Sequence, residues 1–291
     1  MIIKLQIMIK KIIITMFLVL FAGNLNAEVK TYKMVFVPAS EKGEESDYTT
    51  LISITEKLTG FKIDTIKVTD YNAAVEAMRA GRAHIAWYGG KTYVKAAEIA
   101  NAEAFAAGVR PGEKDAGYYT YFVVKKDSKL KEFNDVRGKV LSLNTIGSTS
   151  GDLIPQVELS KINLSIKDKD HFDKVYYAGS HDACLLAVIN KQSDVCGMSS
   201  RNFEARLEDG TFKKEDVRII HKSDRVPPPP LAYSKMIPKE DRNKFKKAVL
   251  EAHNHGEIGG YGGKMSHYME VKDSDYNVLR EVIELLNKNK S

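Results

Sequence analysis

Residues 69–90 read TDYNAAVEAMRAGRAHIAWYGG, and the fold prediction starts from this stretch. Asp70 is a good N-cap for a helix, and Gly81 is a good position for that helix to end. The apolar segment His84–Trp87 then predicts a short buried strand. Because Phe61–Val68 alternates between apolar and polar residues, a strand is also predicted before the helix. Strands that alternate with helices indicate an α/β fold with mostly parallel sheets.

A second block of alternating elements follows further along the chain. Shifting the first block by 110 residues lays Ala73, Ala77 and Ile85 on Ala183, Ala187 and Val195, so the two blocks predict two lobes built on one plan. Generic packing of small residues in α/β units is the alternative explanation. The predicted strands and helices of this block are Val140–Leu143, Thr149–Lys161, Lys174–Tyr177, His181–Asn190 and Asp194–Gly197.

Two segments are suited to carry the chain between the lobes. Gly117–Lys126 is rich in residues that favour strands, and Val226–Leu231 contains four consecutive prolines, which keep the backbone extended. We therefore expect residues 28–120 to begin lobe 1 and residues 121–225 to form lobe 2. Residues 226–291 would form the return crossing and complete lobe 1.

The N-terminus is typical of an exported protein. The first eleven residues carry three lysines and no acidic residue, and an apolar run follows over residues 12–22. This run is shorter than the roughly 20 residues that span a bilayer. The small residue Ala27 then precedes a polar chain, so residues 1–27 predict a signal peptide cleaved after Ala27 and a periplasmic location. An uncleaved membrane anchor is the alternative.

Charge and cysteine content narrow the function classes. Removal of residues 1–27 would leave 41 basic and 38 acidic residues, a balance too mild to indicate nucleic acid or a membrane surface as partner. The two cysteines are Cys184 and Cys196. Export would permit a disulfide between them. Because we place one on a helix and one on a buried strand, both pointing into the core, we expect two separate buried thiols.

The most informative motif is NTIGSTSG, residues 144–151, which we name the hydroxyl segment. It follows a predicted strand and opens a predicted helix, and its hydroxyls stand at the consecutive positions Ser148, Thr149 and Ser150. A helix N-terminus offers unsatisfied N–H groups and a positive partial charge. The motif therefore predicts an oxyanion site that needs no lysine. Simple N-capping is the alternative, although one hydroxyl would suffice for a cap.

Two other stretches carry candidate binding residues. In Gly179–Ala183, which also enters a helix, His181 can donate to an anion and Asp182 can accept from a protonated oxygen. The alternative is an ordinary capping turn. Tyr88 follows a buried strand at a glycine turn, and ligand sites in α/β sheets lie beyond the carboxyl ends of strands. An aromatic cover on the core is the alternative, and it suits Trp87 better than Tyr88.

TDYNAAVEAMRAGRAHIAWYGG, GSTSG and AGSHDACLLAV stand in an order and spacing that resemble one family. These are the periplasmic phosphonate-, phosphite- and phosphate-type binding proteins of ABC transporters. The resemblance runs from about Met34 to the prolines. It implies a two-lobed type II periplasmic-binding fold, in which GSTSG holds phosphoryl oxygens. The site residues that it implies are Tyr88, Ser148, Thr149, Ser150, His181 and Asp182.

The chain also departs from the family's pattern. Members that bind aminoalkylphosphonates place carboxylates where this chain has Arg201 and Pro229. The resemblance then implies either a small, purely anionic ligand or a ligand with a second negative group that Arg201 binds. A solvated helix residue is the alternative reading of Arg201. A carboxylate at Asp182 would favour a protonated phosphorus oxyanion over fully ionised sulfate.

The expected function is that of a binding protein, without a catalytic step. Its expected partners are a small phosphorus oxyanion (phosphite, phosphate or an alkylphosphonate) and an ABC permease of the inner membrane, and the protein is expected to be a monomer. We expect no cofactor. We also expect no metal, because the group His253, His255, Glu257 and His267 lacks a standard ligand spacing. The alternatives are a sulfonate-binding protein and a periplasmic phosphoryl hydrolase that uses His181 as base.

Overall fold

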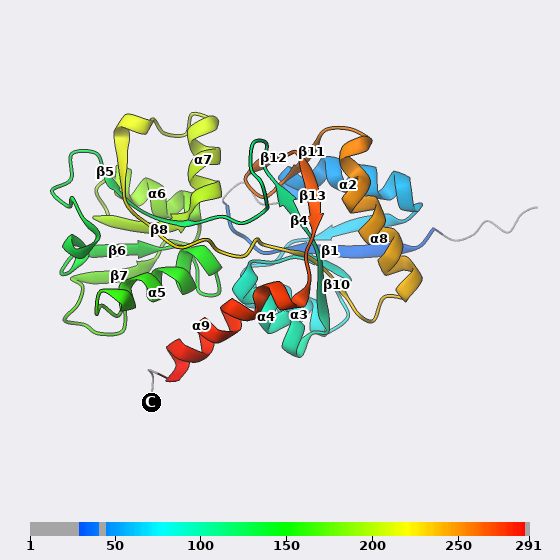
Figure 1. The fold of residues 1–291 in the computed structure, drawn as a ribbon, viewed down its shortest axis with the longest axis horizontal. Helices are drawn as coiled ribbons and strands as arrows, with labels where there is room; N and C mark the ends of the chain where they lie inside the picture. The colour runs from blue at the N-terminus through cyan, green and yellow to red at the C-terminus, as the bar shows by residue number, and fades with distance from the viewer. Residues whose placement is uncertain (1–28, 41–44, 289–291) are drawn as a thin grey trace, which may run out of the picture. The chain divides into compact units, whose positions relative to one another are not determined.

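Two β-sheets with helices packed against them make up the unit from Thr31 to Ser291 in the computed structural model (Figure 1). The structure describes residues 29–40 and 45–288. The predicted signal peptide and its cleavage after Ala27 therefore lie outside the described residues. A separate two-stranded sheet pairs β11 (Ile258–Gly260) with β12 (Gly263–Met265). We call the elements around the six-stranded sheet lobe 1 and those around the five-stranded sheet lobe 2.

Lobe 1 contains the sheet with the strand order β13-β4-β10-β3-β1-β2. β1 pairs in parallel with β2 and β3, whereas β10 and β13 run antiparallel to their neighbours. The strands are β1 (Thr31–Phe36), β2 (Lys62–Ile66), β3 (Ile85–Trp87), β4 (Ala102–Val109), β10 (Leu231–Ser234) and β13 (His267–Glu270). The helices are α2 (Glu45–Thr59), α3 (Tyr71–Arg79), α4 (Gly90–Ile99), α8 (Lys239–Glu251) and α9 (Asn277–Lys288), with short 3-10 turns η4 (Ala252–Asn254) and η5 (Asp273–Tyr276).

Lobe 2 contains the sheet with the strand order β7-β6-β8-β5-β9. β6 is parallel to β7 and β8, and β5 is antiparallel to both of its neighbours. The strands are β5 (Thr120–Lys125), β6 (Val140–Leu143), β7 (Lys174–Tyr177), β8 (Val195–Ser199) and β9 (Val217–Lys222). The helices are the π-helical turn η2 (Thr149–Leu153), α5 (Ile154–Lys161), α6 (His181–Ile189) and α7 (Ser200–Glu208), with 3-10 turns η1 (Phe133–Val136) and η3 (Lys214–Asp216).

The internal repeat extends to the hydrogen bonds that begin and end one helix in each lobe. The Asp70 side chain accepts from the N–H of Ala73 at the start of α3, and Ser180 accepts from Ala183 at the start of α6. Where these helices end, Gly81 and Lys191 both have positive φ angles, 69° and 59°. Each pair of positions differs by the 110 residues of the sequence repeat. The shift therefore reflects a shared local structure.

The chain passes between the sheets twice, as predicted. It leaves β4 at Val109 and enters β5 at Thr120, and it returns between β9 and β10. The two crossing segments run side by side, because Tyr118 and Val226 exchange backbone hydrogen bonds of 3.2 and 2.8 Å (Figure 1). The α/β class with two crossings is thus confirmed, and within residues 29–40 and 45–288 this pair of extended segments is the only connection by the chain between the two large sheets.

Each face of the lobe 2 sheet has its own apolar core. Phe122 and Val124 of β5 pack on one face, and Val123 between them packs on the other. This alternation follows from the two-residue period of a strand. All five residues of β8 are buried, as expected for a strand covered on both faces.

Cys184 and Cys196 form a disulfide, which corrects our expectation of two separate thiols. Both residues are fully buried, on α6 and β8, as predicted. They belong to the same apolar cluster, and their Cα atoms lie 5.6 Å apart, a normal separation for a bridged pair. The two side chains point into one core from facing elements, so they meet.

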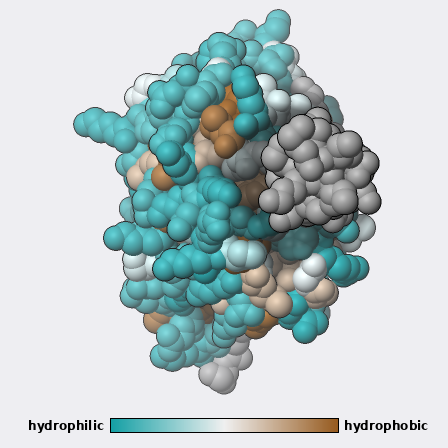
Figure 2. Space-filling model, turned by 90° about the vertical axis from the view of Figure 1, so that its right-hand side faces the viewer, coloured by the Kyte–Doolittle hydropathy of each residue, from teal (hydrophilic) through white to brown (hydrophobic). Residues whose placement is uncertain are grey.

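Few large apolar side chains are exposed among the described residues. The face shown in Figure 2 is covered mainly by hydrophilic residues. The large exposed apolar residues come from different elements; they include Ile99, Met236 and Leu285. Within residues 29–40 and 45–288, no helix combines the length and the apolar character that crossing a membrane requires.

Candidate functional site

The hydroxyl segment forms a tight turn that leads into α5. Ser148 caps the turn, because its Oγ accepts a hydrogen bond of 3.1 Å from the N–H of Gly151. The N–H of Asn144 donates to the Gly151 carbonyl at 2.9 Å, which closes the turn on the end of β6. The first turn is π-helical rather than the α-helix we predicted, since the N–H of Ile154 donates to Thr149.

Only one of the three hydroxyls serves as the helix cap. Ser148, Thr149 and Ser150 are all buried, at 2% exposure each. Thr149 Oγ1 instead accepts from the N–H of Lys91 on α4 at 2.9 Å, a contact between the lobes. Burial raises the pKa of Tyr118 to about 12, and hydrogen bonds to the side chains of Ser150 and Thr149 act in the opposite direction. The hydroxyls beyond the cap are therefore gathered beside Lys91 and Tyr118.

His181 lies against the hydroxyl segment. A Cβ on Gly151 would stand 2.9 Å from His181 Cε1 and 2.3 Å from Asn144 Cβ, so only glycine allows this approach. His181 Nδ1 accepts from the N–H of Ser199 at 3.2 Å. Burial lowers the pKa of His181 to about 3. The imidazole is therefore neutral at pH 7, and its remaining proton lies on Nε2, where it can be donated.

Asp182, the next residue, is buried within lobe 2 beside α7. Its Oδ1 lies 3.6 Å from Nε of Arg206, which also pairs with Asp209 at 2.8 Å. If Asp182 accepts a hydrogen bond from a ligand, it therefore does so beside the Arg206 guanidinium. The sequence did not indicate this pairing.

Tyr88 is directed into lobe 1. Its hydroxyl donates to the Ala74 carbonyl of α3 at 3.2 Å, and the side chain is fully buried. Burial raises its pKa well above the ordinary value. The hydroxyl of Tyr88 is thus hydrogen-bonded to α3, whereas Tyr118 contacts the hydroxyl segment. The prediction missed Tyr118 because the run from Gly117 was interpreted only as a crossing strand; an aromatic hydroxyl at the start of that run was the available signal.

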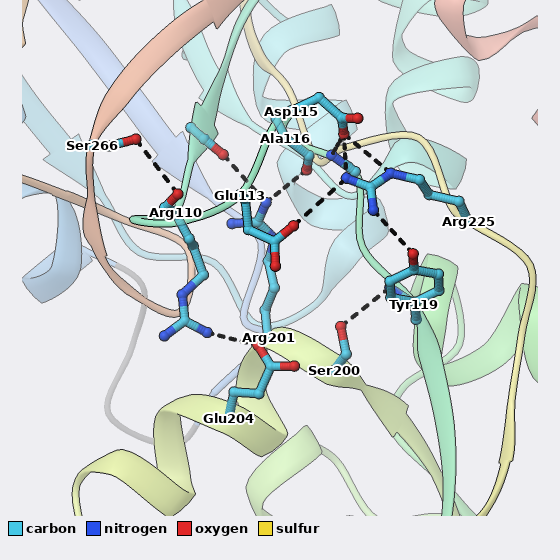
Figure 3. A network of polar contacts seen from close by, with 12 residues as sticks. Arg110, Glu113, Asp115, Ala116, Tyr119, Ser200, Arg201, Glu204, Arg225 and Ser266 are labelled. Atoms are coloured by element: carbon cyan, nitrogen blue, oxygen red, sulfur yellow. Dashed lines mark hydrogen bonds and ion pairs between the residues drawn. The ribbon is translucent and has the colours of Figure 1, made fainter.

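Arg201 is buried rather than solvated, at 3% exposure in the first turn of α7. Figure 3 shows its side chain reaching from α7 to the first crossing segment, where Nη2 donates to the carbonyl of Ala116 at 2.7 Å. Nη2 also donates to the carbonyl of Gly108, near the end of β4, at 3.3 Å. Burial lowers the pKa of the guanidinium from its ordinary value. The reading of Arg201 as an exposed helix residue is therefore wrong.

The site is held closed by contacts between the lobes. Lys91 of α4 forms an ion pair with Asp152 of the π-helical turn, and Thr92 Oγ1 donates to the Gly147 carbonyl at 3.0 Å. Arg110 pairs with Glu204 and Glu208 of α7, at 2.9 and 2.6 Å. The structure therefore describes a closed arrangement. Among the described residues, no three His, Cys, Asp or Glu side chains are grouped so that they could hold a metal ion.

Comparison with known proteins assigns the chain to a family. A family model described as "ABC transporter, phosphonate, periplasmic substrate-binding protein" matches residues 34–276. The chain belongs to this family. Periplasmic binding proteins of ABC importers are exported proteins that deliver ligands to a permease, and the family predicted from the three motifs is confirmed.

Relatives and a solved structure agree with this family assignment. The phosphonates-binding periplasmic protein of Escherichia coli K12 is 30% identical over 230 residues, which cover 73% of this chain and 66% of that protein. The phosphate-import protein PhnD of Mycolicibacterium smegmatis is 25% identical over 281 residues, or 90% of this chain and 87% of that protein. The binding-protein component of an ABC phosphonate transporter from Pseudomonas aeruginosa is similar in structure, with a TM-score of 0.77, 23% identity and coverage of 90% of this chain and 87% of that one. The two-lobed type II periplasmic-binding fold is thereby confirmed.

Proposed function

We propose that the protein is the substrate-binding component of an ABC importer, and that it captures phosphite, phosphate or an alkylphosphonate by lobe closure. The observation that carries this proposal is that the hydroxyl segment and a neutral His181 are buried side by side. Hydroxyls, helix N–H groups and one imidazole N–H are all donors to an oxyanion. Hydrogen bonds to a charged acceptor contribute roughly 1.5–3 kcal/mol each, so a few suffice for tight binding.

The proposed ligand residues are Ser148, Thr149, Ser150 and His181, with Tyr118 added from the structure. Asp182 would accept from a singly protonated oxyanion, as proposed from the sequence. Arg206 offsets part of the negative charge of Asp182 and Asp209, which would reduce repulsion of an incoming anion. Tyr88 would act through the packing of α3, since its hydroxyl is engaged there.

We propose that residues 28–120 and 226–291 move as one lobe against residues 121–225. The paired crossing segments at Tyr118 and Val226 provide a hinge, because few hydrogen bonds need to change when they bend. A ligand that contacts both lobes would favour the closed state through its extra contacts there. The protein would work as a monomer in the periplasm, with the signal peptide removed after Ala27, and would present the closed form to a permease of the inner membrane.

His181 argues against a hydrolytic function. A general base works best with a pKa near the operating pH. With a pKa of about 3, His181 would hold a transferred proton poorly at neutral pH. We therefore propose binding without turnover.

A ligand screen tests the proposed function. Phosphite, phosphate, methylphosphonate, methanesulfonate and sulfate are added to the purified protein, and thermal unfolding is followed. A ligand that binds only the folded state raises the midpoint by mass action. We expect phosphorus oxyanions to raise it and both sulfur compounds to leave it unchanged. Stabilisation by methanesulfonate alone would overturn the proposal, as would turnover of phosphate esters by the same sample.

A further inference from the structure

We propose that the ligand carries a second anionic group, a carboxylate in the simplest case, and that Arg201 and Trp87 bind it. The inference rests on the proposed capture of a phosphorus oxyanion and names the ligand class, a phosphonate joined by a short spacer to a carboxylate. It starts from two buried donors that have no acceptor in the structure: Nε of Arg201 and Nε1 of Trp87.

Arg201 carries a buried positive charge, and the carboxylate of Asp115 interacts with that charge only from beyond ion-pair distance. It is the only arginine among the described residues whose whole side chain and backbone are buried. Its Nη2 donates to two backbone carbonyls, which fix the guanidinium plane and leave Nε for another acceptor. Among the described residues, no carboxylate lies within ion-pair distance of it. An unpaired buried charge is strongly unfavourable, so a bound anion would relieve a cost that the empty protein bears.

Two other shielded arginines in the described part of the chain pair with carboxylates, whereas the partly exposed Arg218 does not. Arg110 pairs with Glu204 and Glu208, and Arg206 pairs with Asp182 and Asp209, although both arginine side chains are more exposed than Arg201, at 12%. The most buried guanidinium has no such ion pair, so a bound anion would supply the close counter-charge that the chain does not.

Trp87 belongs to the same neighbourhood. Its ring centroid lies 4.8 Å from that of Tyr261 and 6.0 Å from that of Tyr48. These two tyrosines, together with Tyr118, also interact with the charge of Arg201. The indole N–H is buried at the end of β3, and no carbonyl or carboxylate accepts from it. The unsatisfied donors of Arg201 and Trp87 therefore both lie near the same group of tyrosines.

Tyr118 connects this group of tyrosines to the hydroxyl segment. It contacts the side chains of Thr149 and Ser150, and its ring centroid lies 6.3 Å from that of Tyr261. A phosphonate on the hydroxyls would thus have Tyr118 beside it and the two free donors beyond. A carboxylate accepts from both a guanidinium N–H and an indole N–H, and hydrogen bonds with ionised partners are the strong ones.

Calorimetry with the purified protein tests the inference, with phosphonoacetate and methylphosphonate as probes. The two probes share the phosphonate and differ in the carboxylate. We expect phosphonoacetate to bind about tenfold tighter or more. In Arg201→Gln this preference should fall to about one. Arg218→Gln is the matched control: Arg218 on β9 also donates to backbone carbonyls, of Ser128 and Leu130, and its Nε also lacks an acceptor. The Arg218→Gln variant should keep the wild-type preference for phosphonoacetate over methylphosphonate.

A second readout needs no variant. Trp87 is the only tryptophan of the chain, so its indole N–H gives a single assigned signal in a ¹⁵N–¹H spectrum. We expect that signal to move downfield with phosphonoacetate and to stay with methylphosphonate. If methylphosphonate binds and phosphonoacetate binds no tighter, this inference is wrong and the proposed function stands. If neither probe nor any other phosphorus oxyanion binds, both are wrong. A preference that survives in Arg201→Gln, or an unmoved indole signal, overturns the assignment of these two donors.

Discussion

Nδ1 of His181 accepts a hydrogen bond from the backbone N–H of Ser199. The acceptor nitrogen cannot carry a proton at the same time, so this bond fixes the tautomer with the proton on Nε2. The bond links the start of α6 to the end of β8, and the disulfide between Cys184 and Cys196 links the same two elements. The imidazole donor of the site is therefore held from two sides.

This arrangement predicts how stability depends on pH. The pKa of His181 is about 3 in the folded protein and near 6.5 when unfolded, so the unfolded chain binds a proton first. The free energy of unfolding therefore keeps its full value above about pH 6.5. As the pH falls toward 3, the lowered pKa of His181 reduces it by at most about 1.4 kcal/mol per pH unit. Denaturant unfolding of the wild type and His181→Asn between pH 4 and 7 measures it. The variant should lose this part of the pH dependence; parallel curves would show that His181 does not titrate as described.

Thr149→Ala is expected to weaken binding of methylphosphonate by about tenfold or more, without unfolding the protein. The change removes one hydroxyl from the hydroxyl segment, and a hydrogen bond to a charged group contributes roughly 1.5–3 kcal/mol. Calorimetry measures the affinity, and Thr211→Ala, on an exposed turn of lobe 2, is the control. An affinity equal to that of the wild type would remove Thr149 from the site.

Lys91→Met is expected to shift the protein toward an open state. The change removes the cation that pairs with buried Asp152 across the lobes and keeps most of the side-chain volume. A partly exposed pair of this kind is worth about 1 kcal/mol, so the apparent affinity should fall by about fivefold. X-ray scattering of ligand-free protein should show a larger radius of gyration than the wild type. Lys95→Met on the same helix is the control; identical profiles for all three proteins would argue against closure through Lys91.

Aminoethylphosphonate should bind more weakly than phosphite, phosphate or methylphosphonate. The buried Arg201 guanidinium would repel the ammonium group, and an ammonium removed from water without a partner is strongly disfavoured. Competition calorimetry against methylphosphonate measures the order. Tighter binding of aminoethylphosphonate than of every small oxyanion would show that a carboxylate faces the ligand in solution.

Periodicity and helix signals predicted the parts of the fold that depend on local sequence. Helix α3 begins after Asp70 and ends before Gly81, as expected. Ser180, which is 110 residues after Asp70, caps α6 in the same way. The hydroxyl segment was found because three adjacent hydroxyls exceed what a cap needs. These features involve residues close together in the chain, which is why a single sequence displays them.

The features that were missed depend on side-chain direction and on long-range contacts. Trp87 and Tyr88 are adjacent, so at the end of a strand their side chains point to opposite sides. Trp87 is buried in the core as we suggested, with its ring against Tyr261. Tyr88 is buried as well, under α3, and this was missed. No local pattern indicates that Arg201 reaches residues more than 80 positions away, or that Arg206 meets Asp182.

Because of the disulfide, the rigidity of the site depends on whether the chain folds in a reducing or an oxidising compartment. In a reducing cytosol Cys184 and Cys196 would stay as thiols, and α6 would be tied to β8 only by noncovalent packing and the Ser199 bond. A chain that matured before export would then offer a less rigid imidazole to its ligand. Oxidation after export would then complete the rigidity of the site, so the covalent bond would couple full affinity to arrival in an oxidising compartment.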